Sequence, residues 1–590
     1  MRLKILKAGV FAGLGLLAVG LFETQVMRAG HYRNLSEHNR VRLIPLEAPR
    51  GHVLDRAGRL LATNRPAFHL VAAPEDLTPD IYPKLAELLN VSEKTIRQRL
   101  SEPREYPFAP AVLAPDISRA LLYAFEELRP ELPGVSVQTD WIRSYPYGET
   151  ASHLIGYLGK INEKEYETSE RARFGMTSLV GRSGIEKIFD ERLRGWRGAR
   201  EVEVNARGER LRVISEKPPV PGEDVVVTID LEFQKKLTEL IRGKKATVAF
   251  LDLKTHELIA LASSPGFDPN VFVSPGGQEA RLHFLGDRDA PLLDRGSGAA
   301  YPPGSVFKLV TALAGLESGK ITPHTTFNCP GFFRLKPGSR PFRCWWEGGH
   351  GPVDLYRALE RSCNVYFYNV GRIVGADALA RTARELGFGQ TFELEMSRLA
   401  PGLVPDSAWK KNHLKEKWYE GETLSFAVGQ SYLQVSPLQV LRLSAIIARN
   451  GEWVEPKLIR DPRSSDTSPE RKIAIQEKHL KVIRQGMLKV VQSDYGTGQL
   501  ARVDFDQMAA KTGTAQAPPK EPHAWITGFF PYADPEIAFV TMIEHGGSGG
   551  INAAKVLKQA IQIWYEMKVP VEPAGGLATV HGELPRGTPA

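Results

Sequence analysis

Cysteine, long apolar runs and clustered positive charge are the features that this 590-residue chain has little of. It contains 3 cysteines, an odd number that leaves at least one of them outside any set of intramolecular disulfides. Beyond the N-terminus no apolar run reaches the length of a membrane span, about 18 residues, which excludes a multi-spanning protein. The net charge is +8, but the basic residues are spread out, and many stand beside Glu or Asp. We therefore expect a solvated basic surface and no nucleic-acid partner.

The one long apolar segment lies at the N-terminus and predicts a membrane anchor. Three basic residues fall within positions 1–7, and residues 8–22 carry no charge. A helix that continues through residue 27 has about 20 residues, enough to cross the hydrocarbon of a bilayer. A secretory signal begins similarly, but no small-x-small cleavage site follows the apolar core here. We expect a cytoplasmic tail at 1–7 and an uncleaved transmembrane anchor at 8–27, with the rest of the chain outside the cytoplasm.

The remaining sequence predicts several globular regions. Alternating apolar and polar residues in 42–72 predict strands, and helical periodicity broken by prolines follows over 80–132. The segment VGRSGIEKIFDERLRG predicts one helix that ends near Gly195, and a Pro-rich stretch marks a boundary near residue 220. In the second half strands are followed by helices and then by strands again. This order favours one sheet sandwiched with helices over a doubly wound parallel sheet.

An S-x-x-K pattern, Ser305 and Lys308, stands at the predicted start of a helix. Pro302, Pro303 and Gly304 precede it, and the lysine, three residues after the serine, shares its helix face. A serine hydroxyl is a weak nucleophile that needs an adjacent base. A lysine can be that base only if burial or a nearby cation lowers its pKa toward neutrality. Alone, this short pattern more often marks a capping serine and a solvated lysine.

A second pattern, Lys511-Thr512-Gly513-Thr514, lies on a probable strand. Strand alternation puts the two threonine hydroxyls on one face, so the lysine would need its long stem to join them. Gly513 allows close approach of a ligand backbone. Alone, these residues also fit an edge strand with a protective lysine. Between the two patterns lies Ser362-Cys363-Asn364, and the ordered set S-x-x-K, S-x-N, K-T-G is far more specific than any single member.

The ordered motifs SVFK, SCN and KTG resemble those of the serine acyltransferases that bind penicillin. The segments RGHVLDRAGRLLATN and VGRSGIEKIFDERLRG resemble the pedestal of class B penicillin-binding proteins, and FAVGQSYLQVSPLQ, DYGTG and WITGFFP resemble their transpeptidase domain. The resemblance covers nearly the whole chain and is nearest to the elongation type. It implies an α+β multidomain protein with a mixed α/β pedestal and a transpeptidase domain, an antiparallel sheet sandwiched with helices as in serine β-lactamases. The implied ranges are a pedestal at 28–220 with a head insertion at about 65–140, a transpeptidase domain at 221–570 and a flexible tail at 571–590.

The resemblance also implies catalytic roles. Ser305 would attack the D-Ala–D-Ala carbonyl of a stem peptide and release the terminal D-Ala, and Lys308 would take the serine proton. Ser362 would relay a proton to the leaving amine and from the incoming one. Asn364 would orient Lys308 and the substrate amide. An amine of a second stem peptide would then resolve the acyl-enzyme.

The third motif implies substrate binding. Lys511 would lower the pKa of Lys308 and attract the substrate carboxylate, which Thr512 and Thr514 would bind, with Gly513 leaving room for the ligand. The backbone N–H groups of Ser305 and Thr514 would form the oxyanion hole. A β-lactam would acylate the same serine.

The cysteines and one histidine form the pattern C-x14-C-x5-H-x12-C, made of Cys329, Cys344, His350 and Cys363. Three thiolates and an imidazole suit tetrahedral zinc, and the Gly/Pro-rich loops between them could wrap a metal. The compartment outside the cytoplasm favours disulfides instead, so a Cys329–Cys344 bridge with Cys363 buried is the rival interpretation.

The resemblance bears on this choice, because some elongation-type members carry a structural zinc at matching positions and others have aspartates at some of them. It implies zinc held by all four side chains, in a structural role because four protein ligands leave no open position. Ser362 and Asn364 would not share a face of a regular helix. Our hypothesis is that Cys363 ties an irregular turn, which carries both residues, to the metal.

The function implied is that of a peptidoglycan D,D-transpeptidase of cell-wall elongation in the bacterial inner membrane, and a target of β-lactams. A septal transpeptidase of the same family or a D,D-carboxypeptidase is the alternative. The sequence lacks the deacylating glutamate of a β-lactamase, the H-E-x-x-H motif of a β-lactam sensor and a match to a glycosyltransferase domain before residue 220. A zinc hydrolase is disfavoured because the four protein ligands would leave the metal no open position for a water molecule. The implied partners are a SEDS-type glycosyltransferase (the RodA kind) that contacts the anchor helix and the pedestal, other elongation-complex proteins, and the stem peptides of the lipid II polymer.

Overall fold

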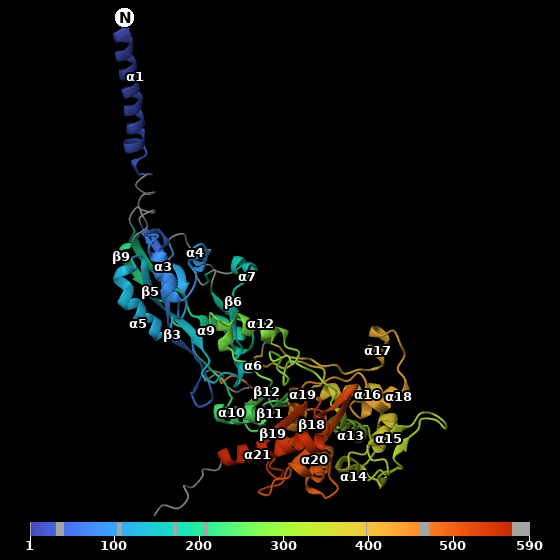
Figure 1. Cartoon of the computed structure of the whole chain (residues 1–590). Helices are drawn as coiled ribbons and strands as arrows, with labels where there is room; N and C mark the ends of the chain where they lie inside the picture. Colours follow the sequence, from blue (N-terminus) through green and yellow to red (C-terminus); the bar gives the residue numbers. More distant parts are fainter. Residues whose placement is uncertain are drawn as a thin grey trace, which may run out of the picture.

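A computed structural model describes residues 2–30, 41–102, 109–168, 174–175, 178–204, 210–396, 398–460 and 471–568. Figure 1 shows an elongated molecule: the N-terminal helix stands apart, the pedestal follows it, and the largest domain lies at the far end. The tail expected at 571–590 lies outside the described residues.

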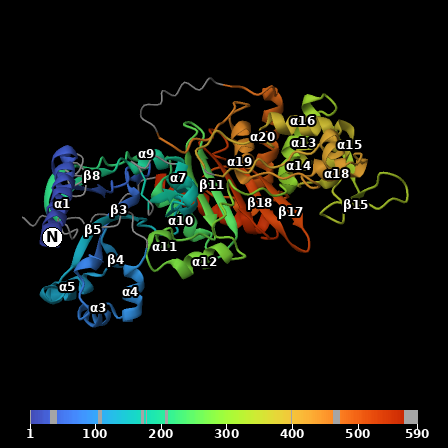
Figure 2. The ribbon, with the colours of Figure 1, turned by 90° about the horizontal axis from the view of Figure 1, so that it is seen from above.

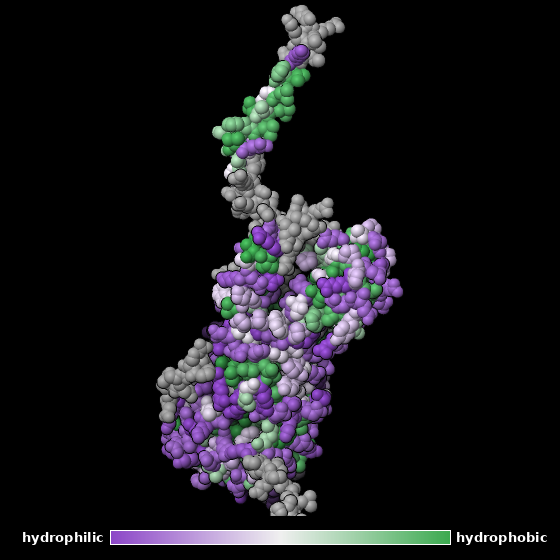
Figure 3. All heavy atoms as spheres, turned by 90° about the vertical axis from the view of Figure 1, so that its left-hand side faces the viewer, coloured by the Kyte–Doolittle hydropathy of each residue, from purple (hydrophilic) through white to green (hydrophobic). Residues whose placement is uncertain are grey.

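The N-terminal helix α1 (Arg2–Phe22) continues into one turn of π-helix, η1 (Glu23–Met27). Residues 9–27 form the one helix in the described ranges that is long and apolar enough to cross a membrane, and none of it is buried by the rest of the protein. Figure 3 shows apolar side chains along this helix, in contrast to the mostly polar surface of the body. Such a helix fits a single-pass membrane anchor, because lipid would cover its apolar side chains.

The pedestal contains two main sheets and a short hairpin. Its strands are β1 (Val41–Leu46), β2 (Val53–Leu54), β3 (Leu60–Ala72), β4 (Ala111–Ala114), β5 (Val135–Ser144), β6 (Leu158–Lys160), β7 (Leu179–Gly181), β8 (Gly198–Val204), β9 (Arg210–Lys217) and β10 (Val225–Val226). The order is β1-β8-β9 in the smaller sheet and β10-β2-β3-β4 in the larger one, where β5 also pairs with β3. Because β10 pairs with β2, the pedestal sheet includes residues beyond the Pro-rich stretch near residue 220.

Short helices cover these sheets. They are α3 (Ile81–Leu89), α4 (Glu93–Leu100), α5 (Arg119–Leu128), α6 (Ser152–Ile155), α7 (Glu163–Thr168), α8 (Gly184–Ile188) and α9 (Asp190–Arg194). The hydroxyls of Ser92 and Ser118 cap α4 and α5 by accepting backbone N–H bonds. Helices α3 to α5 enclose, with β3 and β4, a separate apolar core.

The prediction of a single helix in VGRSGIEKIFDERLRG is wrong, because the segment forms two short helices, α8 and α9. The break falls at Phe189, whose φ of −101° and ψ of 21° depart from helical values. Periodicity could not reveal this break, since the segment is fixed by charged partners far away in the chain.

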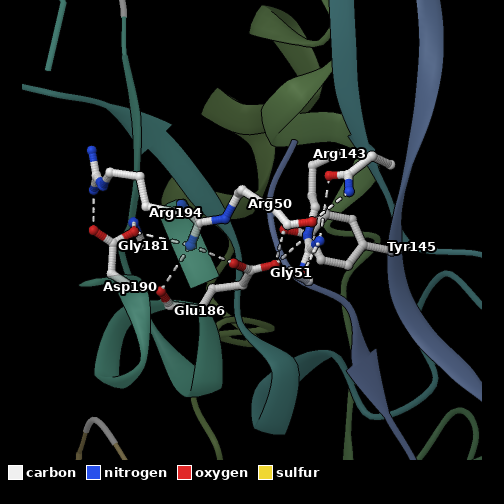
Figure 4. Close-up of polar contacts among 9 residues, drawn as sticks. Arg50, Gly51, Arg143, Tyr145, Gly181, Glu186, Asp190 and Arg194 are labelled. Atoms are coloured by element: carbon white, nitrogen blue, oxygen red, sulfur yellow. Dashed lines mark hydrogen bonds and ion pairs between the residues drawn. The ribbon is translucent and has the colours of Figure 1, made fainter. Parts of the chain in front are cut away.

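Those partners form a buried charge network (Figure 4). The Glu186 carboxylate, with no exposed surface, accepts hydrogen bonds from Arg143 Nε at 2.6 Å and from Arg50 Nη2 at 2.8 Å. Arg50 Nη2 also lies 3.0 Å from Asp190 Oδ1. The network therefore joins α8 and α9 to β5 and to the segment that follows β1.

The C-terminal domain is built on one five-stranded antiparallel sheet, as expected. Its order is β12-β11-β19-β18-β17, and two small hairpins, β13 with β16 and β14 with β15, lie outside it. The strands are β11 (Ala246–Asp252), β12 (Leu258–Ser264), β13 (Phe327–Cys329), β14 (Phe332–Phe333), β15 (Phe342–Arg343), β16 (Gly351–Val353), β17 (Ala509–Ala517), β18 (Lys520–Phe530) and β19 (Ile537–Ile543).

Helices sandwich this sheet. The helices of the domain are α10 (Leu231–Leu240), α11 (Asn270–Val273), α12 (Gln278–Gly286), α13 (Lys308–Glu317), α14 (Leu355–Glu360), α15 (Asn364–Val374), α16 (Ala376–Glu385), α17 (Ser407–His413), α18 (Glu420–Ala427), α19 (Pro437–Ala448), α20 (Glu477–Gln492) and α21 (Ala554–Lys568). Of these, α11 packs against α12 and the pedestal strands β5 and β6. Strand β11 shows why both faces need cover: Val248 and Phe250 pack into the core with α10 and α21, while Ala249 and Leu251 pack into the core with α13 and α19.

Candidate active site

Ser305 lies in a 3-10 turn, η4 (Gly304–Phe307), that leads directly into α13. Gly304 adopts a φ of +54°, and a Cβ there would come within 2.9 Å of the Thr514 carbonyl oxygen on β17. The turn can approach the strand this closely only because residue 304 has no side chain. Ser305 is therefore held at the edge of the sheet, half-buried, with Lys308 fully buried one turn further on.

The Lys308 ammonium is held by the second motif. Its Nζ donates to Asn364 Oδ1 at 2.6 Å, to the Ser362 carbonyl oxygen at 2.7 Å and to Ser362 Oγ at 3.1 Å. Burial lowers the pKa of Lys308 to about 8, against an opposing effect of the nearby cysteine sulfurs. No hydrogen bond joins Lys308 to Ser305 within the described residues, and catalytic hydrogen bonds of this kind often close only when substrate binds.

The turn that carries the second motif is irregular. Ser362 has a φ of +51°, in the left-handed region, and Cys363 follows in an extended conformation as the N-cap of α15. A left-handed conformation costs a residue with a side chain about 1–2 kcal/mol. It lets Ser362 and Asn364 both bond to Lys308, although they are only two residues apart.

Lys511 reaches the same hydroxyl from β17, the edge strand. Its Nζ donates to Ser362 Oγ at 3.0 Å and to the Thr512 carbonyl oxygen at 3.0 Å. Burial and the charge of Lys308 hold the pKa of Lys511 well below its usual value. Two buried ammonium groups that share one hydroxyl repel each other. The doubly protonated pair therefore loses one proton more easily than a solvated lysine does, and one of the two amines becomes neutral.

The threonines of the third motif face a cleft of about 1220 Å³ that also holds Ser305. Gly513 sits between them with no room for a side chain, because a Cβ would come within 2.8 Å of the Pro303 carbonyl oxygen. The expectation that this glycine makes room for a ligand is therefore wrong: its missing side chain lets β17 pack against the turn that carries Ser305. Thr514 Oγ1 accepts a hydrogen bond from the backbone N–H of Gly549 at 3.2 Å. The third motif thus forms one wall of the cleft, opposite the second motif.

One residue of this wall was not assigned from the sequence. The Thr497 hydroxyl lies 2.7 Å from the Thr512 hydroxyl and also lines the cleft. Its sequence signal is the DYGTG segment, where it stands between two glycines, but the spacing alone gives no reason to place it against β17. Gln430, in the FAVGQSYLQVSPLQ segment, also lines the cleft without having been assigned a role, as do Tyr368 and Gln516.

The four predicted metal ligands come together behind the second motif. All three cysteines are free and buried, so the rival Cys329–Cys344 disulfide is not formed here. The sulfur and nitrogen ligand atoms lie within 4.8 Å of one another. His350 Nδ1 is 3.6 Å from Cys329 Sγ and 3.5 Å from Cys344 Sγ. Tetrahedral zinc with ordinary bond lengths separates a sulfur and a nitrogen ligand by about 3.6 Å, so these residues fit a zinc ion.

Comparison with known proteins agrees with this geometry. The model of the penicillin-binding protein transpeptidase domain matches residues 246–562, and that of the penicillin-binding protein dimerisation domain matches residues 45–227. The chain is 32% identical to the peptidoglycan D,D-transpeptidase MrdA of Haemophilus influenzae over 599 residues, which cover 95% of this chain and 91% of that protein.

Solved structures give the same result. The complex of PBP2 with MreC from Helicobacter pylori superimposes with a TM-score of 0.80 at 30% identity, covering 89% of this chain and 99% of that one. A structure of a peptidoglycan synthase complex that coordinates polymerization and crosslinking matches with a TM-score of 0.71 at 31% identity, covering 97% of this chain and 100% of that one. The chain therefore belongs to the class B penicillin-binding proteins, and within them to the elongation type represented by PBP2.

Proposed function

We propose that this protein is a serine-type peptidoglycan D,D-transpeptidase that cross-links stem peptides during cell-wall elongation. The observation that carries the proposal is the buried amine of Lys308, which Ser362 and Asn364 hold one helical turn from Ser305 at the wall of the cleft. A solvated lysine has a pKa too high for a base, whereas a pKa of about 8 leaves a useful neutral fraction near physiological pH.

In the first half-reaction Ser305 Oγ attacks the carbonyl carbon between the two D-Ala residues as Lys308 accepts the hydroxyl proton. The backbone N–H groups of Ser305 and Thr514 stabilise the oxyanion that forms. As the tetrahedral intermediate collapses, the C–N bond breaks, and the proton passes from Lys308 through the Ser362 hydroxyl to the leaving nitrogen. The terminal D-Ala departs, and the peptide remains as an ester of Ser305.

In the second half-reaction an amine of another stem peptide attacks the ester carbon. Its proton returns through Ser362 and Lys308 to Ser305 Oγ, and an amide cross-link forms. Thr512 and Thr514 bind the carboxylate of the donor terminus before it leaves, and Lys511 attracts that carboxylate. Gly513 lets β17 lie close against the turn that carries Ser305, and Thr497 orients the Thr512 hydroxyl.

We also propose a structural zinc ion bound by Cys329, Cys344, His350 and Cys363. Three thiols left close together outside the cytoplasm would be open to oxidation, whereas a bound zinc protects them as thiolates. The ion would cross-link the two small hairpins to the second motif. Since Cys363 lies between Ser362 and Asn364, the ion would keep their turn in its left-handed conformation.

We propose further that the protein acts in the bacterial cytoplasmic membrane with the elongation machinery. Its partner would be a multi-spanning SEDS-type glycosyltransferase of the RodA kind, contacted through α1 and the pedestal. Support comes from the related PBP2 that is found with MreC and from the related chain of a peptidoglycan synthase complex.

The test is acylation and product formation by the full-length protein in detergent. Fluorescent penicillin is expected to label the wild type and a Ser425→Ala control, which removes another cleft hydroxyl, but not Ser305→Ala. Donor peptides that end in D-Ala–D-Ala, given with an acceptor amine, should yield free D-Ala and a cross-linked dimer. Labelling that survives in Ser305→Ala would refute the nucleophile, and D-Ala release without a dimer would make the protein a carboxypeptidase.

A further inference from the structure

A basic arm, residues 334–343, borders the active-site cleft and has no role in the mechanism above. Its sequence, RLKPGSRPFR, contains Arg334, Lys336, Arg340 and Arg343 and no acidic residue. The arm joins β14 to β15, and Figures 1 and 2 show it extending from the C-terminal domain on the side away from the pedestal.

Two of the four basic residues lie at the cleft. Arg340 and Arg343 line it, whereas Arg334 and Lys336 do not. The Arg343 side chain is 75% exposed, and the Glu347 carboxylate lies 4.0 Å from it on a side chain that is 88% exposed. Within the described residues Arg340 has no hydrogen bond or ion pair. Both guanidinium groups are thus available to a ligand in the cleft.

The position of Arg343 is set by the catalytic centre itself. Its carbonyl oxygen accepts hydrogen bonds from Asn364 Nδ2 at 3.3 Å and from the Tyr368 hydroxyl at 3.2 Å. Cys344, the next residue, belongs to the cysteine–histidine cluster. Trp345 Nε1 then donates to the Arg361 carbonyl oxygen at 2.8 Å, directly before Ser362. The base of the arm is therefore fixed to the second motif, while the side chains of Arg340 and Arg343 make no close ion pair within the described residues.

The positive and negative charges of the cleft lie on different elements. Among the described residues, the charged ones that line it are Arg340 and Arg343 on the arm and Glu521 on β18. The terminal carboxylate of a donor peptide binds at the threonines of the third motif, with its scissile carbonyl at Ser305. The rest of the peptide must leave along the remaining length of the cleft, and Glu521 would repel an anionic residue there. The two arginines of the arm would attract an anionic residue of the peptide.

We propose that Arg340 and Arg343 bind a free carboxylate of the donor peptide, upstream of its D-Ala–D-Ala end, and so select an acidic donor. This inference rests on the proposed transpeptidase function and names the chemistry of its substrate. A guanidinium fork matches a carboxylate with two parallel hydrogen bonds, which a carboxamide cannot satisfy. Because the contact lies at an exposed rim, we expect a preference of about tenfold for the carboxylate over the carboxamide.

The experiment uses two synthetic donor peptides that end in D-Ala–D-Ala and differ only in one upstream group, a free carboxylate or a carboxamide. The readout is the ratio of their kcat/KM values for D-Ala release by the full-length protein, so that a general loss of activity in a variant cancels. The wild type should show a ratio of about ten. Arg340→Gln and Arg343→Gln should each reduce it toward one, and Arg340→Glu should favour the carboxamide.

The matched control is Lys336→Gln, which removes one positive charge from the same arm but outside the cleft. It should keep the wild-type ratio. A ratio of one in the wild type, or an unchanged ratio in both arginine variants, would overturn the inference while D-Ala release and penicillin labelling still support a transpeptidase. An equal fall in Lys336→Gln would mean that only the net charge of the arm matters, and would also overturn it. If the wild type released no D-Ala from either peptide and no penicillin labelled Ser305, the proposed function would fail as well.

Discussion

The side chain of Asn364 joins the buried base to the basic arm. Its Oδ1 accepts a hydrogen bond from Lys308 Nζ at 2.6 Å, and its Nδ2 donates to the Arg343 carbonyl oxygen at 3.3 Å. One amide thus fixes the amine that activates the nucleophile and the loop that borders the substrate cleft. A carboxylate at this position could accept from Lys308 but could not donate to the Arg343 carbonyl, and an apolar side chain could do neither.

Replacing Asn364 by alanine should therefore slow acylation. The buried Lys308 ammonium loses its shortest hydrogen bond, and an unsatisfied buried polar group costs about 1–3 kcal/mol, so we expect a loss of about 10–100-fold. The rate constant for labelling by fluorescent penicillin measures it. Asn369→Ala is the control, because within the described part of the chain that amide, on the same helix, bonds to the Val365 carbonyl and to no group of the site. Equal rates in the two variants would contradict the role given to Asn364.

The pH dependence of acylation should follow Lys308. Burial lowers its pKa to about 8, so the amine is protonated and unable to accept the Ser305 proton below that pH and neutral above it. The rate constant for penicillin acylation should rise with pH and reach half of its maximum near about pH 8. Stopped-flow labelling across this range tests the expectation, and a rate that is flat or falls through pH 8 would argue against Lys308 as the base.

The same pKa shift predicts how stability changes with pH. The pKa of Lys308 is lower in the folded protein than in the unfolded chain, so the unfolded chain binds more protons between about pH 8 and pH 10.5. Unfolding free energy should therefore increase with pH across that window, and Lys308→Met should lack this contribution. Urea unfolding at several pH values measures the unfolding free energy. If it changed with pH by the same amount in the wild type and in Lys308→Met, the prediction would be contradicted.

Metal analysis should find about one zinc per chain in the purified protein. The triple variant Cys329→Ser, Cys344→Ser, Cys363→Ser should contain none, and zinc retained in it would rule out the proposed site. Cys363→Ser alone should slow penicillin acylation, because the turn that holds Ser362 and Asn364 loses its tie to the metal. An unchanged acylation rate in that single variant would separate the metal site from catalysis.

The left-handed conformation of Ser362 should be visible in stability. Glycine adopts a φ of +51° without strain and alanine does not, so Ser362→Gly should be more stable than Ser362→Ala by about 1 kcal/mol. Both variants remove the hydroxyl to which Lys308 and Lys511 donate, so both should acylate slowly. Thermal unfolding compares them, and a more stable alanine variant would show that the turn relaxes out of the left-handed region.

The pedestal network should depend on the charge of Glu186. Burial alone would raise its pKa, but the charges of Arg143 and Arg50 outweigh burial and lower it. The carboxylate thus stabilises the fold above the unfolded pKa, and this contribution is lost as pH falls through the lower folded value. Glu186→Gln should cost about 3–5 kcal/mol, because it leaves buried arginines without a counter-charge.

The control for this prediction is Glu131→Gln, whose partner Lys84 forms an exposed ion pair with it at 2.6 Å. An exposed pair contributes little, because water screens its charges. Urea unfolding at neutral pH compares the two variants, and similar losses of stability in both would mean that the buried network adds nothing special.

Much of this protein is encoded locally. The apolar stretch at residues 8–27, the strand and helix periodicities of the second half and the three ordered motifs predicted the anchor, the sandwiched antiparallel sheet and the family. These features are readable because secondary structure follows from short-range periodicity, and because a motif keeps its residue types at fixed spacing. The spacing of the cysteines and His350 likewise predicted four side chains that the fold brings together.

Other features depend on contacts between residues far apart in the chain. Lys308 and Asn364 are separated by 56 residues, and the hydroxyl of Thr497 meets that of Thr512 only because α20 packs beside β17. The left-handed turn at Ser362, the break between α8 and α9, and the attachment of Arg343 to the second motif have no local signature. The sequence by itself determined which residue types are available for the chemistry. Only the tertiary structure decided their protonation and their direction, because burial and long-range hydrogen bonds, not neighbours in sequence, set both.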